Sequence, residues 1–239
     1  MKLNHGHSAE EIAERLAKPA QASRLSDSVY GAIDGAVTTF AIVAGVKGAG
    51  LSPSVIIALG FANVLADGFS MAASNYSGTK AARDDLRRLR AIEEEHIALE
   101  PEGEREELRQ ILQSKGLEGR VLTEATAAIA AKPKAWIDMM LVGEYGVSPV
   151  DPNPMRAAVA TFVAFLAAGL VPLVPFIFGL ASAFSISVVV TACVFFTIGA
   201  LKSRWSLTPW WKSGTETLLI GGVAATIAFF VGSLFNTGG

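Results

Sequence analysis

Five runs of about 20 mostly apolar residues, interrupted once by a long charged stretch, decide what this chain can fold into. An α-helix needs about 20 such residues to cross the hydrocarbon core of a bilayer. A soluble domain of 239 residues does not need so many runs of that length. With 51% hydrophobic residues, the sequence predicts an all-α integral membrane protein with five transmembrane helices.

The distribution of positive charge predicts how these spans are oriented. The spans are expected at residues 29–46, 54–77, 155–178, 182–201 and 215–235. Of the 20 Lys and Arg residues, 4 precede the first span, 12 lie between spans two and three when Arg156 is included, and 3 lie between spans four and five. Only Lys47 is on the other side of the predicted membrane. Positively charged connections stay in the cytoplasm. The N-terminus and the central stretch are therefore predicted to be cytoplasmic, and the C-terminus to face the opposite side.

The charged central stretch is predicted to be a helical domain inserted between spans two and three. Helices are expected at about 80–99, 103–115, 118–131 and 134–145, and the first could simply continue the second span. The predicted parts are a cytoplasmic N-terminal segment (1–27), spans one and two (28–79), a cytoplasmic helical domain (80–152) and spans three to five (153–239).

Several classes of protein and site are excluded by what the sequence lacks. The N-terminus carries a short amphipathic helix at 8–18, with Ser8 as N-cap and Glu11 in the capping-box position, and no apolar signal peptide. The single cysteine, Cys193, allows neither an intramolecular disulfide nor a CxxC metal site. No basic cluster of the kind that binds nucleic acid is present.

The second span carries a polar stripe that an idle membrane helix would not have. Asn63, Asp67, Ser70, Met71 and Ser74 recur at steps of three and four and so share one helix face. A charged group inside a membrane helix costs roughly 2.5 to 3.5 kcal/mol on insertion scales, which makes Asp67 a candidate functional residue. A carboxylate beside a thioether suits a transition metal better than Mg²⁺ or Ca²⁺. The alternative is structural, with Asp67 bonded to another helix and Met71 filling a gap.

A second acid, Asp34, lies inside the first span. Thr38 follows it by one turn, and Gly31 and Gly35 flank it with the GxxxG spacing that lets two helices approach closely. Two carboxylates, Asp34 and Asp67, are thus predicted to lie within membrane spans.

The central domain contains pairs of metal-ligand residues at helical spacing. Glu93 and His96 are three residues apart, as are Glu104 and Glu107, while Met140 and Glu144 are four apart. Each pair therefore projects from one helix face. A Glu-x-x-His pair with further glutamates is the ligand pattern of iron and manganese sites in helical bundles. The alternative is an ordinary solvated face, as charged helices usually have.

Three stretches resemble the vacuolar iron transporter family. They are DGAVTTFAIVAG (34–45), ADGFSMAASNYSGTKA (66–81) and IDMMLVGEYGV (137–147), and the prolines of PLVPF (172–176) fit as well. The resemblance implies a homodimer of five-helix protomers that exchanges cytosolic Fe²⁺, often also Mn²⁺, for protons along a pathway between the two first helices. It also implies pathway ligands at Asp34 and Met71, and cytoplasmic ligands at Glu93, Glu104, Glu107, Met140 and Glu144. With Thr38 and Asp67 beside them, the predicted transport pathway comprises Asp34, Thr38, Asp67 and Met71.

Two positions depart from the pattern of that family. Asn75 stands where the family usually carries an acid, which shifts any proton-coupling role toward Asp67 or Asp34. His96 stands where a second glutamate is usual, and because a metal binds only the neutral imidazole, its ligation should weaken as pH falls.

The function predicted is a metal/proton antiporter, not an enzyme, that moves Fe²⁺ and also Mn²⁺ out of the cytoplasm as transported ions rather than prosthetic groups. The alternatives are a membrane-anchored di-iron storage or ferroxidase-like protein and a metal-sensing scaffold. The bacterial inner membrane is the favoured location and a vacuolar membrane the alternative.

Overall fold

The computed structural model describes residues 6–17 and 25–236, and all the regular structure in these ranges is helical. Five stretches are long and apolar enough to cross a membrane, as predicted. The helices are α1 (Ala9–Ala17), α2 (Leu25–Gly48), α3 (Pro53–Leu99), α4 (Pro101–Ser114), α5 (Gly119–Ala130), α6 (Pro133–Gly143), α7 (Pro154–Gly169), η1 (Val171–Leu173), α8 (Val174–Ile177), α9 (Ala183–Lys202), η2 (Ser203–Trp205) and α10 (Trp210–Leu234).

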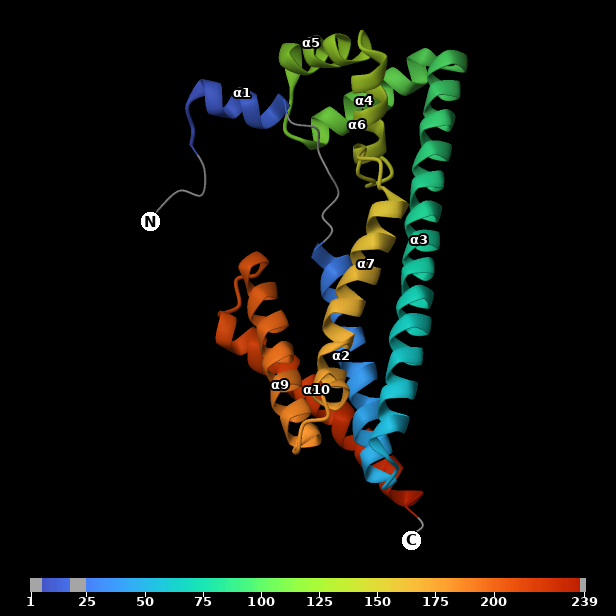
Figure 1. Cartoon of the computed structure of the whole chain (residues 1–239). Coiled ribbons are helices and arrows are strands. Elements are labelled where there is room, and N and C mark those ends of the chain that lie inside the picture. The colour runs from blue at the N-terminus through green and yellow to red at the C-terminus, as the bar shows by residue number, and fades with distance from the viewer. Residues whose placement is uncertain (1–5, 18–24, 237–239) are drawn as a thin grey trace. The chain divides into compact units, whose positions relative to one another are not determined.

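The described residues form two compact units. One, the membrane unit, comprises residues 25–79 and 154–236, and the other contains residues 6–17 and the insert, residues 80–153. Helix α3 belongs to both, because it runs without a break from Pro53 to Leu99 (Figure 1). The sequence left open whether the helix after residue 80 continues the second span, and the structure shows that it does.

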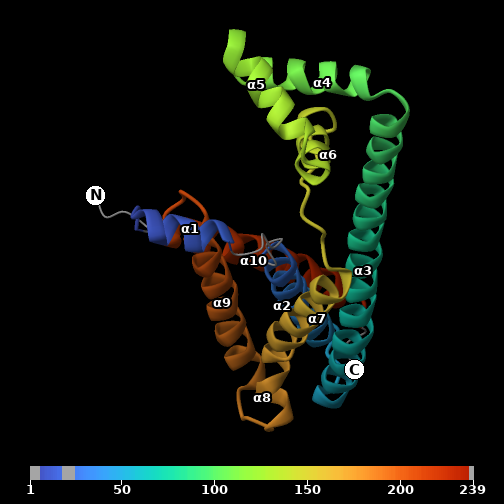
Figure 2. The ribbon, with the colours of Figure 1, turned by 90° about the horizontal axis from the view of Figure 1, so that it is seen from above.

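Helix α2 is the centre of the membrane unit, where it packs against α7, α9 and α10 (Figure 2). Its Gly31 and Gly35 lie against the backbone of α7, and a Cβ at either position would clash with the carbonyl oxygen of Thr161 or Phe165. The close approach predicted from the GxxxG spacing is thus confirmed. Its partner, however, is α7 of the same chain, so this glycine face gives no support to a dimer.

The third span is broken at its prolines. Helix α7 ends at Gly169, and η1 and α8 carry the chain through Pro172 and Pro175. Proline has no N–H to donate, so it leaves carbonyl groups without helical partners. The hydroxyl of Ser187 donates to the carbonyl oxygen of Pro172 at 2.7 Å and satisfies one of them.

Some helix ends differ from those expected. Helices α4 and α6 begin at Pro101 and Pro133, slightly earlier than the expected starts at residues 103 and 134. Proline is well suited to the first turn of a helix. Helix α6 ends at Gly143, which leaves Glu144 as its C-cap rather than inside it. At the N-terminus the capping box of Ser8 and Glu11 is confirmed by reciprocal hydrogen bonds, while the expected last residue of that helix, Lys18, lies outside the described residues.

Candidate metal sites

Glu93, on the last turns of α3, is the most deeply buried acid of the insert. It has no exposed surface, and its Oε1 accepts a hydrogen bond of 2.8 Å from the hydroxyl of Tyr145. Its other oxygen, Oε2, is buried without a hydrogen-bond partner. A buried carboxylate oxygen without a partner is costly, which makes it a candidate ligand for a cation.

Glu104, near the start of α4, faces Glu93. Its side chain is 7% exposed, and its Oε1 lies 3.3 Å from Nδ1 of His96. Burial is the main cause that raises the pKa of Glu104, and the charges of Glu93 and Glu107 raise it further, against the opposing effect of His96. Its Oε2 is also buried and unpartnered.

Glu144 and Glu107 complete this group of acids. The pKa of Glu144 is raised by burial and by the charges of Glu93 and Glu107, while a hydrogen bond from Tyr145 lowers it. Burial and the bond to Glu93 raise the pKa of the Tyr145 hydroxyl, so Tyr145 keeps its proton. The acid cluster is defined here as Glu93, His96, Glu104, Glu107 and Glu144.

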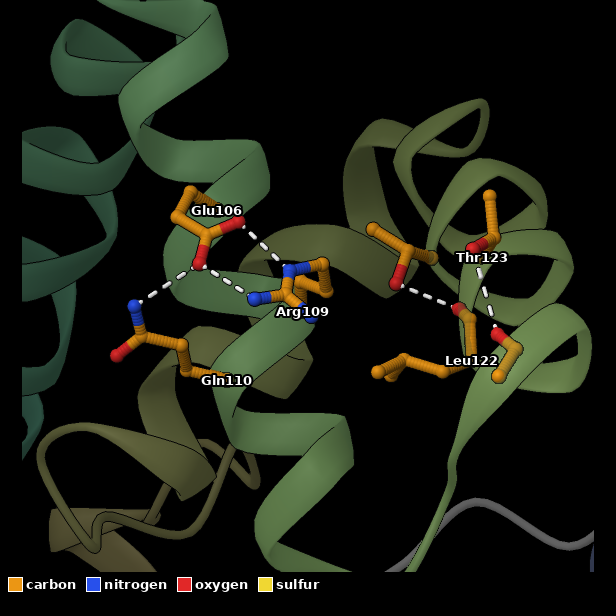
Figure 3. A network of polar contacts seen from close by, with 7 residues as sticks. Glu106, Arg109, Gln110, Leu122 and Thr123 are labelled. Carbon is orange, nitrogen blue, oxygen red and sulfur yellow. Dashed lines mark hydrogen bonds and ion pairs between the residues drawn. The ribbon is translucent and has the colours of Figure 1, made fainter.

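Not every acid of α4 belongs to the acid cluster. Glu106 is held on its own helix by Arg109, at 2.7 Å, and by Gln110, at 3.0 Å (Figure 3). These contacts lower the pKa of Glu106 to about 2. The charge of Glu106 is therefore balanced by Arg109, whereas the Oε2 atoms of Glu93 and Glu104 have no hydrogen-bond partner.

The predicted methionine ligand lies in the apolar core of the insert. Met140 has no exposed surface and packs with Leu108, Leu112, Leu122 and Trp136. In the described part of the chain, no three His, Cys, Asp or Glu side chains converge closely enough to hold one ion as they stand. Ligation by the acid cluster therefore requires its side chains to rotate toward the ion.

In the membrane unit, the two predicted intramembrane acids come from adjacent helices. Asp34 of α2 is partly buried and lies within electrostatic range of Asp67 of α3. Asp67 is exposed within the single chain, and Met71, one turn on, is partly buried. The hydroxyl of Thr38 donates to the backbone carbonyl of Asp34 at 2.8 Å and accepts from Asn63 of α3 at 3.3 Å.

A second polar network in the membrane unit was not predicted from the sequence. The Nδ2 group of Asn75 donates to Oδ1 of Asp27 at 2.9 Å and to Oγ1 of Thr161 at 2.7 Å. Thr79 donates to Oδ1 of Asn75 at 3.3 Å. Asn75 thus joins α2, α3 and α7, and its amide supplies a donor that a carboxylate lacks.

The hydrogen bond between Tyr145 and Glu93 was also not predicted from the sequence. Tyr145 directly follows Glu144 at the end of α6, where Gly146 turns the chain with φ +66°. The ring packs on the cluster of Leu86, Leu89, Ile137 and Leu141, which brings its hydroxyl to α3. Only the packing of α6 on α3 reveals that contact.

Comparison with known proteins identifies the family of this chain. Residues 25–233 match the model of the VIT family. The chain is 32% identical to vacuolar iron transporter 1 of Eucalyptus grandis, over 85% of this chain and 83% of that protein. It is also 32% identical to vacuolar iron transporter 1 of Arabidopsis thaliana, over 85% and 82%, and 34% identical to a vacuolar iron transporter of Toxoplasma gondii, over 87% and 73%. A family match over nearly all of the described residues, with relatives at this identity, shows that the chain belongs to the VIT family.

Proposed function

We propose that this protein exchanges Fe²⁺, and also Mn²⁺, for protons and moves the metal out of the cytoplasm. Membership in the VIT family makes it a membrane transporter and not an enzyme, and the relatives named above are iron transporters. The finer points, namely proton coupling, manganese, direction and assembly, are argued from the residues.

The observation that carries the proposal is that Asp34 and Asp67, on two membrane helices, lie within electrostatic range of each other. Two carboxylates near each other in an apolar medium repel, and a bound proton or cation relieves that repulsion. Protons and a divalent metal therefore compete for the same pair. If the pair opens to one side of the membrane at a time, that competition couples the two fluxes.

Met71 supports a selective site beside this pair. A thioether is a soft ligand, which Fe²⁺ and Mn²⁺ tolerate better than Mg²⁺ or Ca²⁺ do. Together with Thr38, these three residues are the pathway that we propose.

The exposure of Asp67 favours a second copy of the chain. A carboxylate on the outer face of a membrane helix would contact lipid, which costs several kcal/mol. A homodimer that joins α2 and α3 of one protomer to the same helices of its partner would cover Asp67 and double the ligand set. Such a dimer does not need the glycine face of α2, which α7 occupies.

The acid cluster of the insert is proposed as the site that collects metal before transport. It combines two buried carboxylates, each with an unpartnered oxygen, with His96 and two further acids. A local excess of negative charge raises the concentration of cations beside it. With the insert in the cytoplasm, the collected ion would be one destined for export.

The names of the relatives bear on the host membrane. Those cited are vacuolar transporters, which favours the vacuolar alternative over the bacterial inner membrane. A membrane around an acidic compartment also supplies the protons that an antiporter consumes.

The test is metal flux into liposomes that contain the purified full-length protein, with an imposed pH gradient and a pH-sensitive dye inside. We expect Fe²⁺ or Mn²⁺ to move with an opposite movement of protons, and Asp34→Ala to abolish both. Glu216→Gln, which removes an exposed acid at the start of α10, is the matched control and should keep both fluxes. Transport without proton movement, or transport by Asp34→Ala, would contradict the mechanism.

The storage or ferroxidase alternative finds less support. A di-iron bundle uses two Glu-x-x-His sets, and this chain supplies only Glu93 with His96. Membership in a transporter family also argues against it.

A further inference from the structure

The connection between α9 and α10, residues 202–212, exposes an unusual number of aromatic side chains. Trp205, Trp210 and Trp211 are 65%, 59% and 56% exposed, and Leu207 is fully exposed. Three of the four tryptophans of the chain lie in these residues. The fourth, Trp136, is buried in the core of the insert.

The same connection is strongly positive. It contains Lys202, Arg204 and Lys212, and none of them forms an ion pair with another part of the chain that the structure describes. The sequence has no Asp or Glu between Asp151 and Glu216. Between residues 154 and 234, Glu216 of α10, four residues after Lys212, is the one acid of the sequence that could offset this positive charge.

The position of the connection at the ends of two membrane helices suggests what it contacts. Helix α9 ends at Lys202 and α10 begins at Trp210, so the connection lies at one membrane surface, on the same side as the first residues of α2 and α7. Tryptophan is enriched at the level of the lipid headgroups, where its ring is in an apolar region and its N–H in a polar one. The ring of Trp210 packs edge-on against Phe196 with centroids 5.9 Å apart, which anchors it to α9.

We propose that residues 202–212 bind anionic phospholipid headgroups of the leaflet on that side. Each Lys or Arg near an anionic membrane surface strengthens the attraction by roughly fivefold, and three such residues act together here. The tryptophans set the depth of the segment, and the cations select the charge of the headgroup. This interaction is separate from transport and does not depend on the proposed metal pathway.

The tryptophans themselves provide the measurement. The full-length protein is reconstituted into vesicles of neutral phosphatidylcholine mixed with phosphatidylglycerol, and either lipid carries bromine on its acyl chains, which quenches tryptophan fluorescence on contact. At equal fractions, we expect brominated phosphatidylglycerol to quench more than brominated phosphatidylcholine. Trp136 contributes a constant background because it is 4% exposed.

Charge removal then tests the role of the three cations. The variant K202Q/R204Q/K212Q should lose the excess quenching by phosphatidylglycerol while its quenching by phosphatidylcholine stays the same. Lys47→Gln, which removes an exposed cation at the other end of α2, should keep the excess. Because salt screens such an attraction, added salt should reduce the excess in the unaltered protein, a result that needs no variant to fold.

Two outcomes would overturn the proposal. Equal quenching by both lipids would mean that the segment is an aromatic belt with no preference for charge. Absence of quenching by either lipid would mean that protein, either a second copy or the insert, covers the tryptophans instead.

Discussion

The hydroxyl of Tyr145 donates a hydrogen bond of 2.8 Å to Oε1 of Glu93, a carboxylate with no exposed surface. The bond leaves Oε2 of Glu93 as the oxygen without a partner. Tyr145 therefore orients the carboxylate as an outer-shell residue orients a metal ligand.

Replacing Tyr145 by Phe should weaken metal binding by the insert about tenfold or more, as loss of an outer-shell partner does in known metal sites. The ring should stay packed on α3 and α6, so the fold should not change. Calorimetric titration of the full-length protein with Mn²⁺ measures the affinity. Tyr30→Phe, at a tyrosine that is 65% exposed, is the matched control. Equal affinity in both variants would rule out a positioning role for Tyr145.

Glu104→Gln should have two opposite effects. Without metal it should stabilise the insert, since it removes a buried charge that its neighbours Glu93 and Glu107 repel. The affinity of the variant for Mn²⁺ should fall by about tenfold or more, because an amide is a poorer ligand for a hard cation than a carboxylate is. Thermal unfolding with a chelator and with Mn²⁺ would separate the two effects.

Glu106→Gln is the control on the same helix. Its carboxylate is exposed and paired with Arg109, so metal affinity should not change (Figure 3). A loss of affinity equal to that of Glu104→Gln would mean that the insert binds metal through general negative charge and not through the acid cluster.

The stability of the metal-free insert should depend on pH through Glu104 and Glu144. Both carboxyl groups have a pKa above the usual 4.5 in the folded protein, so the native state binds more protons than the unfolded state. Their contribution to stability is therefore full below pH 4.5 and is lost as pH rises through the raised pKa values. Unfolding measured across this range with a chelator should show the decline.

Metal should reverse this trend, because it binds the deprotonated carboxylates. Affinity for Mn²⁺ should rise with pH over the same range, and the double variant Glu104→Gln with Glu144→Gln should remove most of the pH dependence of stability. If the double variant keeps the full pH dependence, other groups are responsible.

The crossing of α2 and α7 should tolerate no side chain at Gly35. A Cβ there would clash with the carbonyl oxygen of Phe165, and overpacking of this kind costs about 1 to 3 kcal/mol. Gly35→Ala should therefore lower the unfolding temperature of the protein in detergent. Gly222→Ala, at a helical glycine with nothing within 4 Å, should not lower it.

Much of the architecture could be predicted because it follows from local patterns. The length of each apolar run predicts a span, and prolines such as Pro172 and Pro175 favour a break inside a membrane helix. The continuation of α3 past residue 80 was one of two possibilities that the sequence left open. Helix starts were less accurate, since Pro101 and Pro133 suit the first turn of a helix as well as the residue before it.

The candidate sites also have one part that the sequence could predict and one part that it could not. Spacing along a helix could place Glu93 with His96 and Glu104 with Glu107, because residues three and four apart share a face. Spacing could not show that these faces meet, that Tyr145 bonds to Glu93, or that Asn75 joins Asp27 to Thr161. Such contacts join residues up to 86 positions apart in the chain.

The sequence alone therefore determined the all-helical membrane class, the five spans and the types of residue available to bind metal, because these depend on composition and on periods of a few residues. The tertiary structure decided which of these residues meet, which carboxylate oxygens are buried without a partner, and that α7 occupies the glycine face of α2. These properties depend on how distant helices pack and on which polar groups that packing removes from water, and neither is encoded in the spacing within one helix.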